Sequence, residues 1–182
     1  MQRIIRPVQQ DELKKSLDFV EKVFTHSESA EDGKIVRNLL AEIRSKKYYE
    51  PQLDLVMVNE QNEIVGQAIF ARFHLDGKYE HEMLVLNIVS VKTELQRQHI
   101  SKDLIEFGLA RAKELGYKFC MVEGNPQNYR SRGFVTSAPY GITAHESVGL
   151  PAPECLMVQE LVEGGLKGVS GQLCYHFYET LR

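Results

Sequence analysis

Two apolar strand-like segments joined through one amphipathic helix constrain the fold more than any other feature of the sequence. Met83–Val91 is apolar apart from Asn87 and Ser90, as expected of a central strand that is covered on both faces. The segment Gln98–Leu115 follows, and its apolar residues recur three or four positions apart, which predicts a helix. Tyr117–Glu123 is again a strand of the buried kind. This order predicts an α/β fold with helices on both faces of a mixed sheet.

The apolar spacing in the rest of the sequence predicts further strands and helices of the same domain. Further strands are predicted at Ile4–Val8, Leu53–Val58, Ile64–Leu75 and Cys155–Val162, and helices at Asp11–Phe24, Glu31–Arg44 and, as a short turn-like helix, Asn125–Arg132. Asp76, Gly77 and Lys78 form a predicted hairpin turn. The last segment, Gly164–Arg182, contains four glycines within eight residues and is predicted to be an irregular extension. With 182 residues in all, we expect a single domain over 1–163 with residues 164–182 packed on it.

Charge and cysteine usage exclude several classes of protein. The net charge is −3 and the isoelectric point about 6.1, so no basic footprint for nucleic acid is present. The longest nearly apolar run is about half the length that spans a bilayer, and the first residues do not resemble a signal peptide. The three cysteines lack metal or redox spacing, and this pattern suits a reducing cytoplasm. No metal is predicted, because His74, His145 and His176 have no partner at ligand spacing in the sequence.

The connection between the central strand and the long helix is a candidate anion site. A helix N-terminus carries unpaired backbone N–H groups and a partial positive charge, which suit a phosphate. Residues 92–118 add six basic and only four acidic side chains. The sequence has neither the glycine-rich dinucleotide fingerprint nor a P-loop, so the two commonest nucleotide sites are excluded. Every strand–turn–helix unit has such a helix start, so this feature alone is weak evidence.

Three motifs in this region resemble those of the GNAT superfamily of acetyl-CoA-dependent N-acetyltransferases, and the resemblance covers Ile4–Val162. The motifs are the phosphate loop Gln96-Arg97-Gln98-His99-Ile100-Ser101, the element Asn125-Pro126-Gln127-Asn128-Tyr129-Arg130-Ser131-Arg132-Gly133-Phe134, and the helix ending Ala110-Arg111-Ala112-Lys113-Glu114-Leu115-Gly116-Tyr117. The second is similar to a bacterial branch of the family with a Tyr…Gly-Phe element. The family fold is a mixed, mostly antiparallel sheet that splays between the central strand and the next, parallel strand.

The phosphate loop departs from the family pattern. His99 and Ser101 fill two positions that are glycine in the family, and Arg97 fills a third that is often glycine. Glycine lets the backbone approach a pyrophosphate without a Cβ in the way. Two outcomes are open: the loop has drifted and binds coenzyme A poorly, or its amides remain usable and Arg97 adds a phosphate contact.

The resemblance implies a set of site residues. Tyr129 matches the tyrosine that protonates the departing thiolate, and the N–H of Val89 matches the group that polarises the thioester carbonyl. Asn125 matches a position near the pantetheine arm. The residues implied in binding acetyl-CoA are Val89, Val91, Gln96, Arg97, Gln98, His99, Ile100, Ser101, Lys102, Asn125 and Tyr129. No general base is assigned, because Glu80, His81, Glu82, His26 and Glu28 all read as ordinary surface residues.

The function that follows is transfer of an acetyl group from acetyl-CoA to a primary amine on a small molecule, a peptide or a protein. The expected partners are acetyl-CoA and an amine acceptor, with no nucleic acid and no membrane, and a homodimer is left open. One alternative is a binding or regulatory module that has the GNAT fold but has lost catalysis. Another is an assembly protein that associates through the acidic segment 139–182, which has five acidic and two basic residues.

Overall fold

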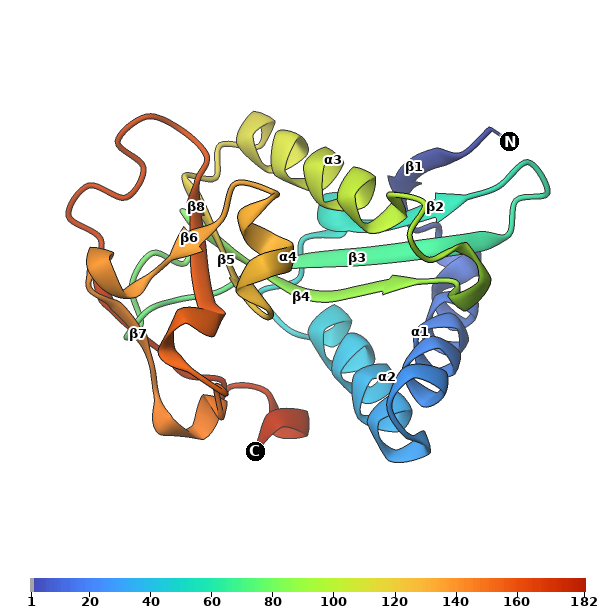
Figure 1. The fold of residues 1–182 in the computed structure, drawn as a ribbon, viewed down its shortest axis with the longest axis horizontal. Coiled ribbons are helices and arrows are strands. Elements are labelled where there is room, and N and C mark those ends of the chain that lie inside the picture. The colour runs from blue at the N-terminus through green and yellow to red at the C-terminus, as the bar shows by residue number, and fades with distance from the viewer. Residues whose placement is uncertain (1) are drawn as a thin grey trace. The chain divides into compact units, whose positions relative to one another are not determined.

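The computed structural model describes residues 2–182 of the chain (Figure 1). Its helices are α1 (Leu13–Ser27), α2 (Ala30–Ser45), α3 (Ile100–Glu114) and α4 (Pro126–Arg130). Its strands are β1 (Ile4–Pro7), β2 (Asp54–Val58), β3 (Ile64–Arg72), β4 (Met83–Val91), β5 (Phe119–Glu123), β6 (Val135–Thr136), β7 (Ile142–Ala144), β8 (Leu156–Glu160) and β9 (Gly171–Leu173). The chain forms two compact units. Unit 1 contains the residues up to Ala71 and Asn87–Gly108, and unit 2 contains Arg72–Leu86 and Leu109–Arg182.

The strands confirm the predicted mixed sheet. Their order is β1-β2-β3-β4-β5-β8-β6, and β4 passes from unit 2 into unit 1. The pairs β1–β2, β2–β3, β5–β8 and β6–β8 are antiparallel, whereas β4–β5 is parallel. The parallel ladder joins Met83–Leu86 to Phe119–Val122, after which β4 continues to Val91 while β5 ends at Glu123. The ladder therefore covers only the first part of β4.

In unit 1, helices cover both faces of the sheet. A Cβ at Gly66 of β3 would lie 2.7 Å from the Ile100 side chain of α3, so this residue faces α3. The next residue, Gln67, points to the opposite face, where its amide donates to Asp54 at 3.3 Å. Asp54 in turn binds Arg44 of α2, so α2 covers that face. Figure 1 shows the same layers, with α1 and α2 side by side below the sheet and α3 above it.

A buried ion pair fixes α2 to this sheet. Asp54 is fully buried and accepts from Nε of Arg44 at 2.8 Å and from the Tyr49 hydroxyl at 2.8 Å. Arg44 also donates to the Ser16 hydroxyl of α1 at 2.8 Å. Burial raises the pKa of Tyr49 well above its ordinary value, and the neighbouring Asp54 carboxylate raises it further. Two helices and the sheet are thereby joined through one charged cluster.

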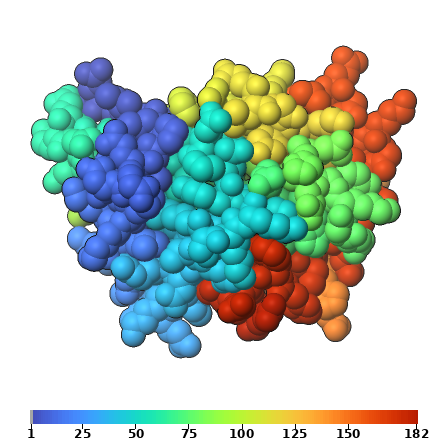
Figure 2. Space-filling model, turned by 180° about the vertical axis from the view of Figure 1, so that it is seen from behind, coloured from blue at the N-terminus to red at the C-terminus, as the bar shows by residue number. Residues whose placement is uncertain are grey.

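In unit 2, the C-terminal segment differs from the irregular extension predicted for Gly164–Arg182. It contains β9, which pairs in parallel with β7, and neither of these strands was predicted. Most of its apolar side chains are buried, including Leu173 and Tyr178 with no exposed surface. Phe73 stacks on Tyr178 at a centroid distance of 5.5 Å, so this segment completes the core of the unit. In Figure 2 the C-terminal residues (red) lie next to residues drawn in green, which belong to the same unit.

The other boundaries differ by a few residues from those predicted. The predicted strand Ile64–Leu75 ends at Arg72, and Leu75 instead pairs with Lys78 across a two-residue turn. Asp76 and Gly77 of that turn have φ values of 50° and 76°, as a tight hairpin requires. The long helix starts at Ile100, two residues later than predicted. Within residues 2–182, no helix combines the length and the apolar character needed to cross a membrane.

Candidate active site

The loop that precedes α3 adopts a glycine-like backbone without glycine. Arg97 has a φ of 63° and His99 a φ of 62°, both in the left-handed region. An L-residue in that region costs about 1–2 kcal/mol relative to a right-handed conformation. Two of the three positions at which the family pattern has or often has glycine therefore take this conformation, whereas the third, Ser101, lies in α3.

The first turn of α3 directly follows these two residues. The His99 carbonyl accepts from the Asp103 amide at 2.9 Å, so His99 caps the helix and the amides after it have no intrahelical acceptor. The buried side chain of Ile100 anchors the turn, whereas the side chains of residues 96–99 are exposed. Lys102 pairs with Glu106 at 2.8 Å, which holds one cation beside the helix start. The backbone amides of a helix start, together with this charge, suit a diphosphate.

Contacts from elsewhere in unit 1 hold the loop in place. Arg3 donates a hydrogen bond to the Gln98 side chain, which ties the loop to the residues before β1. The amide of Lys92 donates to the Val65 carbonyl of β3 at 2.9 Å. Since alternate strand residues direct their polar groups to opposite edges, Val91 and Val89 direct theirs away from β3. Both side chains are half-buried.

Unit 2 contains the other predicted site residues, on and before α4. The Asn125 side chain caps α4 by accepting from the Gln127 amide at 2.9 Å. Tyr129 is half-buried and packs edge-on against Phe134 at a centroid distance of 5.8 Å. A Cβ at Gly124 would lie 2.5 Å from the Tyr129 ring, so only glycine lets the strand end approach this ring so closely. Burial raises the pKa of Tyr129, which keeps its hydroxyl protonated at neutral pH.

Glu123 is an ionisable group that sequence reasoning missed. It is the last residue of β5 and accepts a hydrogen bond from the buried hydroxyl of Tyr175. Glu123 is exposed as a residue, but partial burial of its carboxyl group raises its pKa to about 7, although the Tyr175 hydroxyl opposes that shift. Its side chain lines a pocket of about 450 Å³ together with Gly124, Asn125, Pro126, Leu150, Pro151 and Cys155. The only sequence signal was its position directly before Gly124 and Asn125.

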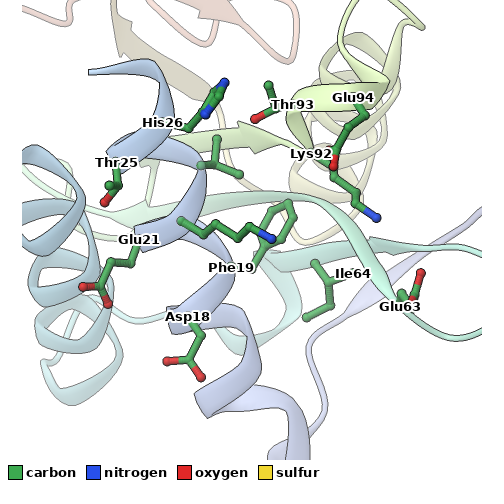
Figure 3. Close-up of a pocket in the computed structure, with 12 residues that line it drawn as sticks. Asp18, Phe19, Glu21, Thr25, His26, Glu63, Ile64, Lys92, Thr93 and Glu94 are labelled. Carbon is green, nitrogen blue, oxygen red and sulfur yellow. The ribbon is translucent and has the colours of Figure 1, made fainter. Parts of the chain in front are cut away.

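Unit 1 has a larger pocket, of about 950 Å³, between α1, the start of β3 and the segment after β4 (Figure 3). Its walls include apolar side chains from α1 and β3, among them Phe19, Val23 and Ile64. His26 lies at the same end as Thr93 in Figure 3. Two of the four acids that line it are paired, because Arg37 binds both Asp18 and Glu21.

The surface residues considered as possible general bases lie in different surroundings. His26 lines the pocket of unit 1, whereas Glu28 is exposed and is not among the residues that line it. Glu82 forms an ion pair with Lys118 at 2.8 Å, and His81 contacts Arg72. Most residues predicted to bind acetyl-CoA lie in unit 1, at Val89, Val91 and Gln96–Lys102. The other two, Asn125 and Tyr129, lie in unit 2.

Known proteins resemble this chain in sequence pattern and in fold. The family model for the acetyltransferase (GNAT) domain matches residues 4–136. No curated protein sequence matches significantly. The GNAT family N-acetyltransferase YhbS from Escherichia coli, solved with CoA, has a TM-score of 0.80 and 21% identity over 97% of this chain and 92% of its own.

Two further solved structures have a similar fold. A GNAT family acetyltransferase from Brucella melitensis, in complex with acetyl-CoA, has a TM-score of 0.60 and 26% identity over 73% of this chain and 82% of its own. A histone acetyltransferase HPA2-related acetyltransferase from Corynebacterium glutamicum has a TM-score of 0.60 and 21% identity over 87% and 96%. The matched domain covers most of the chain and includes the loop, α3 and Tyr129. The chain belongs to the GNAT acetyltransferase family.

Proposed function

We propose that this protein transfers the acetyl group of acetyl-CoA to a primary amine. The observation that carries the proposal is the left-handed backbone at Arg97 and His99 directly before the first turn of α3. A loop with two residues in this unfavourable backbone conformation persists only where the surrounding structure holds it. Such strain is concentrated at ligand sites. The Brucella melitensis relative, which binds acetyl-CoA, supports the same ligand here.

The groups in unit 1 would hold the donor. The amides of Ile100, Ser101 and Lys102 suit the diphosphate of acetyl-CoA, with Arg97 adding a charge-assisted contact. The backbone groups of Val89 and Val91, directed away from β3, suit the pantetheine arm. The Val89 N–H would then polarise the thioester carbonyl and stabilise the oxyanion that forms as the amine attacks.

The groups in unit 2 would move the protons. The attacking amine must lose a proton, and a carboxylate with a pKa of about 7 is matched to that task at neutral pH. We assign Glu123 this role as general base. When the tetrahedral intermediate collapses, the C–S bond breaks and the sulfur takes the electron pair. Tyr129, still protonated, donates its proton to that sulfur, which yields coenzyme A and the acetylated amine.

The pocket of unit 1 is the candidate acceptor site. Its apolar walls, and the pairing of Asp18 and Glu21 with Arg37, favour an acceptor with one amine on a mainly apolar body over a polyamine. A panel of amines that differ in charge and apolar size tests this assignment. A preference for polyamines would contradict it, and a selective rise in KM in Phe19→Ala would support it.

The test of the proposed function has two arms. Calorimetric titration of the purified chain with acetyl-CoA should give saturable heat, and incubation with the amine panel should release free thiol. Tyr129→Phe should keep the affinity for acetyl-CoA and lower kcat. An absence of heat and of thermal shift at millimolar acetyl-CoA would favour the alternative of a binding module that has lost its coenzyme. Unchanged turnover in Tyr129→Phe would show that Tyr129 is not the acid.

A further inference from the structure

Three side chains of the types that bind transition metals meet beside the β7–β9 pair of unit 2. They are His145, Cys174 and His176, and their candidate ligand atoms all lie within 4.8 Å of one another. In the sequence the first is separated from the other two by a long stretch of chain, which is why no metal was predicted. The β-pairing brings them together: Ala144 is opposite Leu173, so His145 and Cys174 leave the paired strands next to each other.

The backbone holds this arrangement in place. The His145 amide donates to the Leu173 carbonyl at 2.8 Å, one residue beyond the ladder. The rings of His145 and His176 are 5.3 Å apart between centroids, in an edge-on arrangement. His145 and Cys174 are half-buried and His176 is exposed, so the cluster is open to an ion from solvent on one side. Tyr175, between the two C-terminal members, points the other way and is buried.

The spacing is close to that of a tetrahedral site. Zn–N bonds of about 2.0–2.1 Å and Zn–S bonds of about 2.3 Å place ligand atoms roughly 3.4–3.7 Å apart. The candidate ligand atoms, which lie within 4.8 Å of one another, would therefore have to approach by about 1 Å. Side-chain rotation at a partly exposed site allows such a movement. Three ligands from the protein leave the fourth position to water.

Ser147 supplies the outer partner that a metal-bound imidazole needs. Its hydroxyl lies 2.7 Å from Nδ1 of His145 and 3.8 Å from Sγ of Cys174. The Ser147 amide also donates to Nδ1, at 3.1 Å. With an ion on Nε2, Nδ1 carries the proton and donates to the Ser147 hydroxyl instead, which fixes the ring and its tautomer.

We propose that His145, Cys174 and His176 bind one Zn²⁺ ion. A thiolate with two imidazoles is a zinc-type ligand set, and the group contains no carboxylate, which excludes the hard cations Ca²⁺ and Mg²⁺. Binding releases the thiol proton of Cys174 to solvent and changes no oxidation state. The ion would join the segment after β7 to the segment after β9 and so hold the C-terminal residues, including Tyr175, against the rest of unit 2.

The test is a zinc titration of the metal-stripped full chain against a chromogenic chelator. The expected result is one ion per chain with a submicromolar dissociation constant. Cys174→Ser and His176→Ala should each weaken binding by more than about 100-fold, because loss of an outer partner alone costs 10–100-fold. The matched control is Cys155→Ser, which removes another half-buried free cysteine outside the cluster and should leave binding unchanged.

Cobalt substitution gives an independent reading of the ligands. Co²⁺ bound at the site should show thiolate-to-cobalt charge-transfer absorption, which Cys174→Ser abolishes and Cys155→Ser keeps. Circular dichroism of each variant controls for folding. Zinc binding that is weaker than about 10 µM, or that persists in both ligand variants, would overturn the proposal and indicate only adventitious surface binding. The readouts require no acetyl transfer, so they stand apart from the proposed function.

Discussion

His99→Gly tests whether the loop before α3 is strained yet intact. His99 is exposed and has a φ of 62°, so its side chain contributes little packing while its backbone conformation is unfavourable for an L-residue. Glycine removes a strain of about 1–2 kcal/mol. Glycine also costs about 0.5–1 kcal/mol, because it loses more backbone freedom on folding. We therefore expect the free energy of unfolding of the variant to be unchanged or slightly increased.

Gln96→Gly is the matched control, because it separates the two contributions. Gln96 is also exposed and lies in the same loop, but its φ is −60°, an ordinary value. The entropic cost of glycine is common to both variants, so it cancels in their difference. His99→Gly should be more stable than Gln96→Gly by about 1–2 kcal/mol. For a chain of this length that difference corresponds to roughly 2–8 °C in Tm, which differential scanning calorimetry resolves.

The same variant decides between a working and a decayed coenzyme site. If the amides after His99 already face the ligand, removal of the imidazole should change the affinity for acetyl-CoA by less than about threefold, or under 0.7 kcal/mol. Equal destabilisation by His99→Gly and Gln96→Gly would refute the strained conformation. A gain in affinity of more than about tenfold would show that the side chain obstructs the site and would favour the binding-module alternative.

The remaining predictions concern the frame of unit 1 and the proton-transfer groups of unit 2. Asp54→Asn leaves the Arg44 charge buried without a counter-ion and should cost about 3–5 kcal/mol of stability in denaturant unfolding, whereas Asp18→Asn, at an exposed ion pair, should cost little. Gly124→Ala should displace the Tyr129 ring and lower kcat by about 10–100-fold while acetyl-CoA still binds, and an unchanged kcat would argue against Tyr129 as the acid. The transfer rate should rise with pH through about 7, as Glu123 loses its proton, and Glu123→Gln should remove that inflection. Because the folded-state pKa of Glu123 lies above its ordinary value, this residue should lower stability as pH rises from about 4.5 to above 7, and a Glu123→Gln variant should lack that loss.

The core of the fold could be predicted because its signals are local. The apolar run Met83–Val91 and the apolar spacing of the following helix each depend on neighbouring residues, and the strand has the predicted bounds. The shape of the phosphate loop was not accessible in this way. Arg97 and His99 have side chains that favour right-handed backbone, and the turn between β4 and α3 overrides that preference.

The strand within the C-terminal segment could not be predicted, because glycines dominate the sequence there. Gly164 and Gly168 do take the positive φ values typical of loops. Leu166 and Val169, between and after them, are nevertheless buried. The parallel pairing of β7 with β9 depends on a contact between segments far apart in the chain, and each strand is only three residues long. So short a strand carries too little alternation to be recognised from sequence.

The same distinction separates the two proton-transfer groups. Tyr129 could be assigned from a motif because everything that positions it lies nearby in the chain: Asn125 caps its helix, and Phe134 packs on its ring. The raised pKa of Glu123 comes from burial of its carboxyl group, and Tyr175, which hydrogen-bonds to it and opposes that shift, belongs to the C-terminal segment. A carboxylate acquires a perturbed pKa from what the fold places against it. Glu123 could therefore be proposed as the general base only after the fold showed what surrounds it at the end of β5.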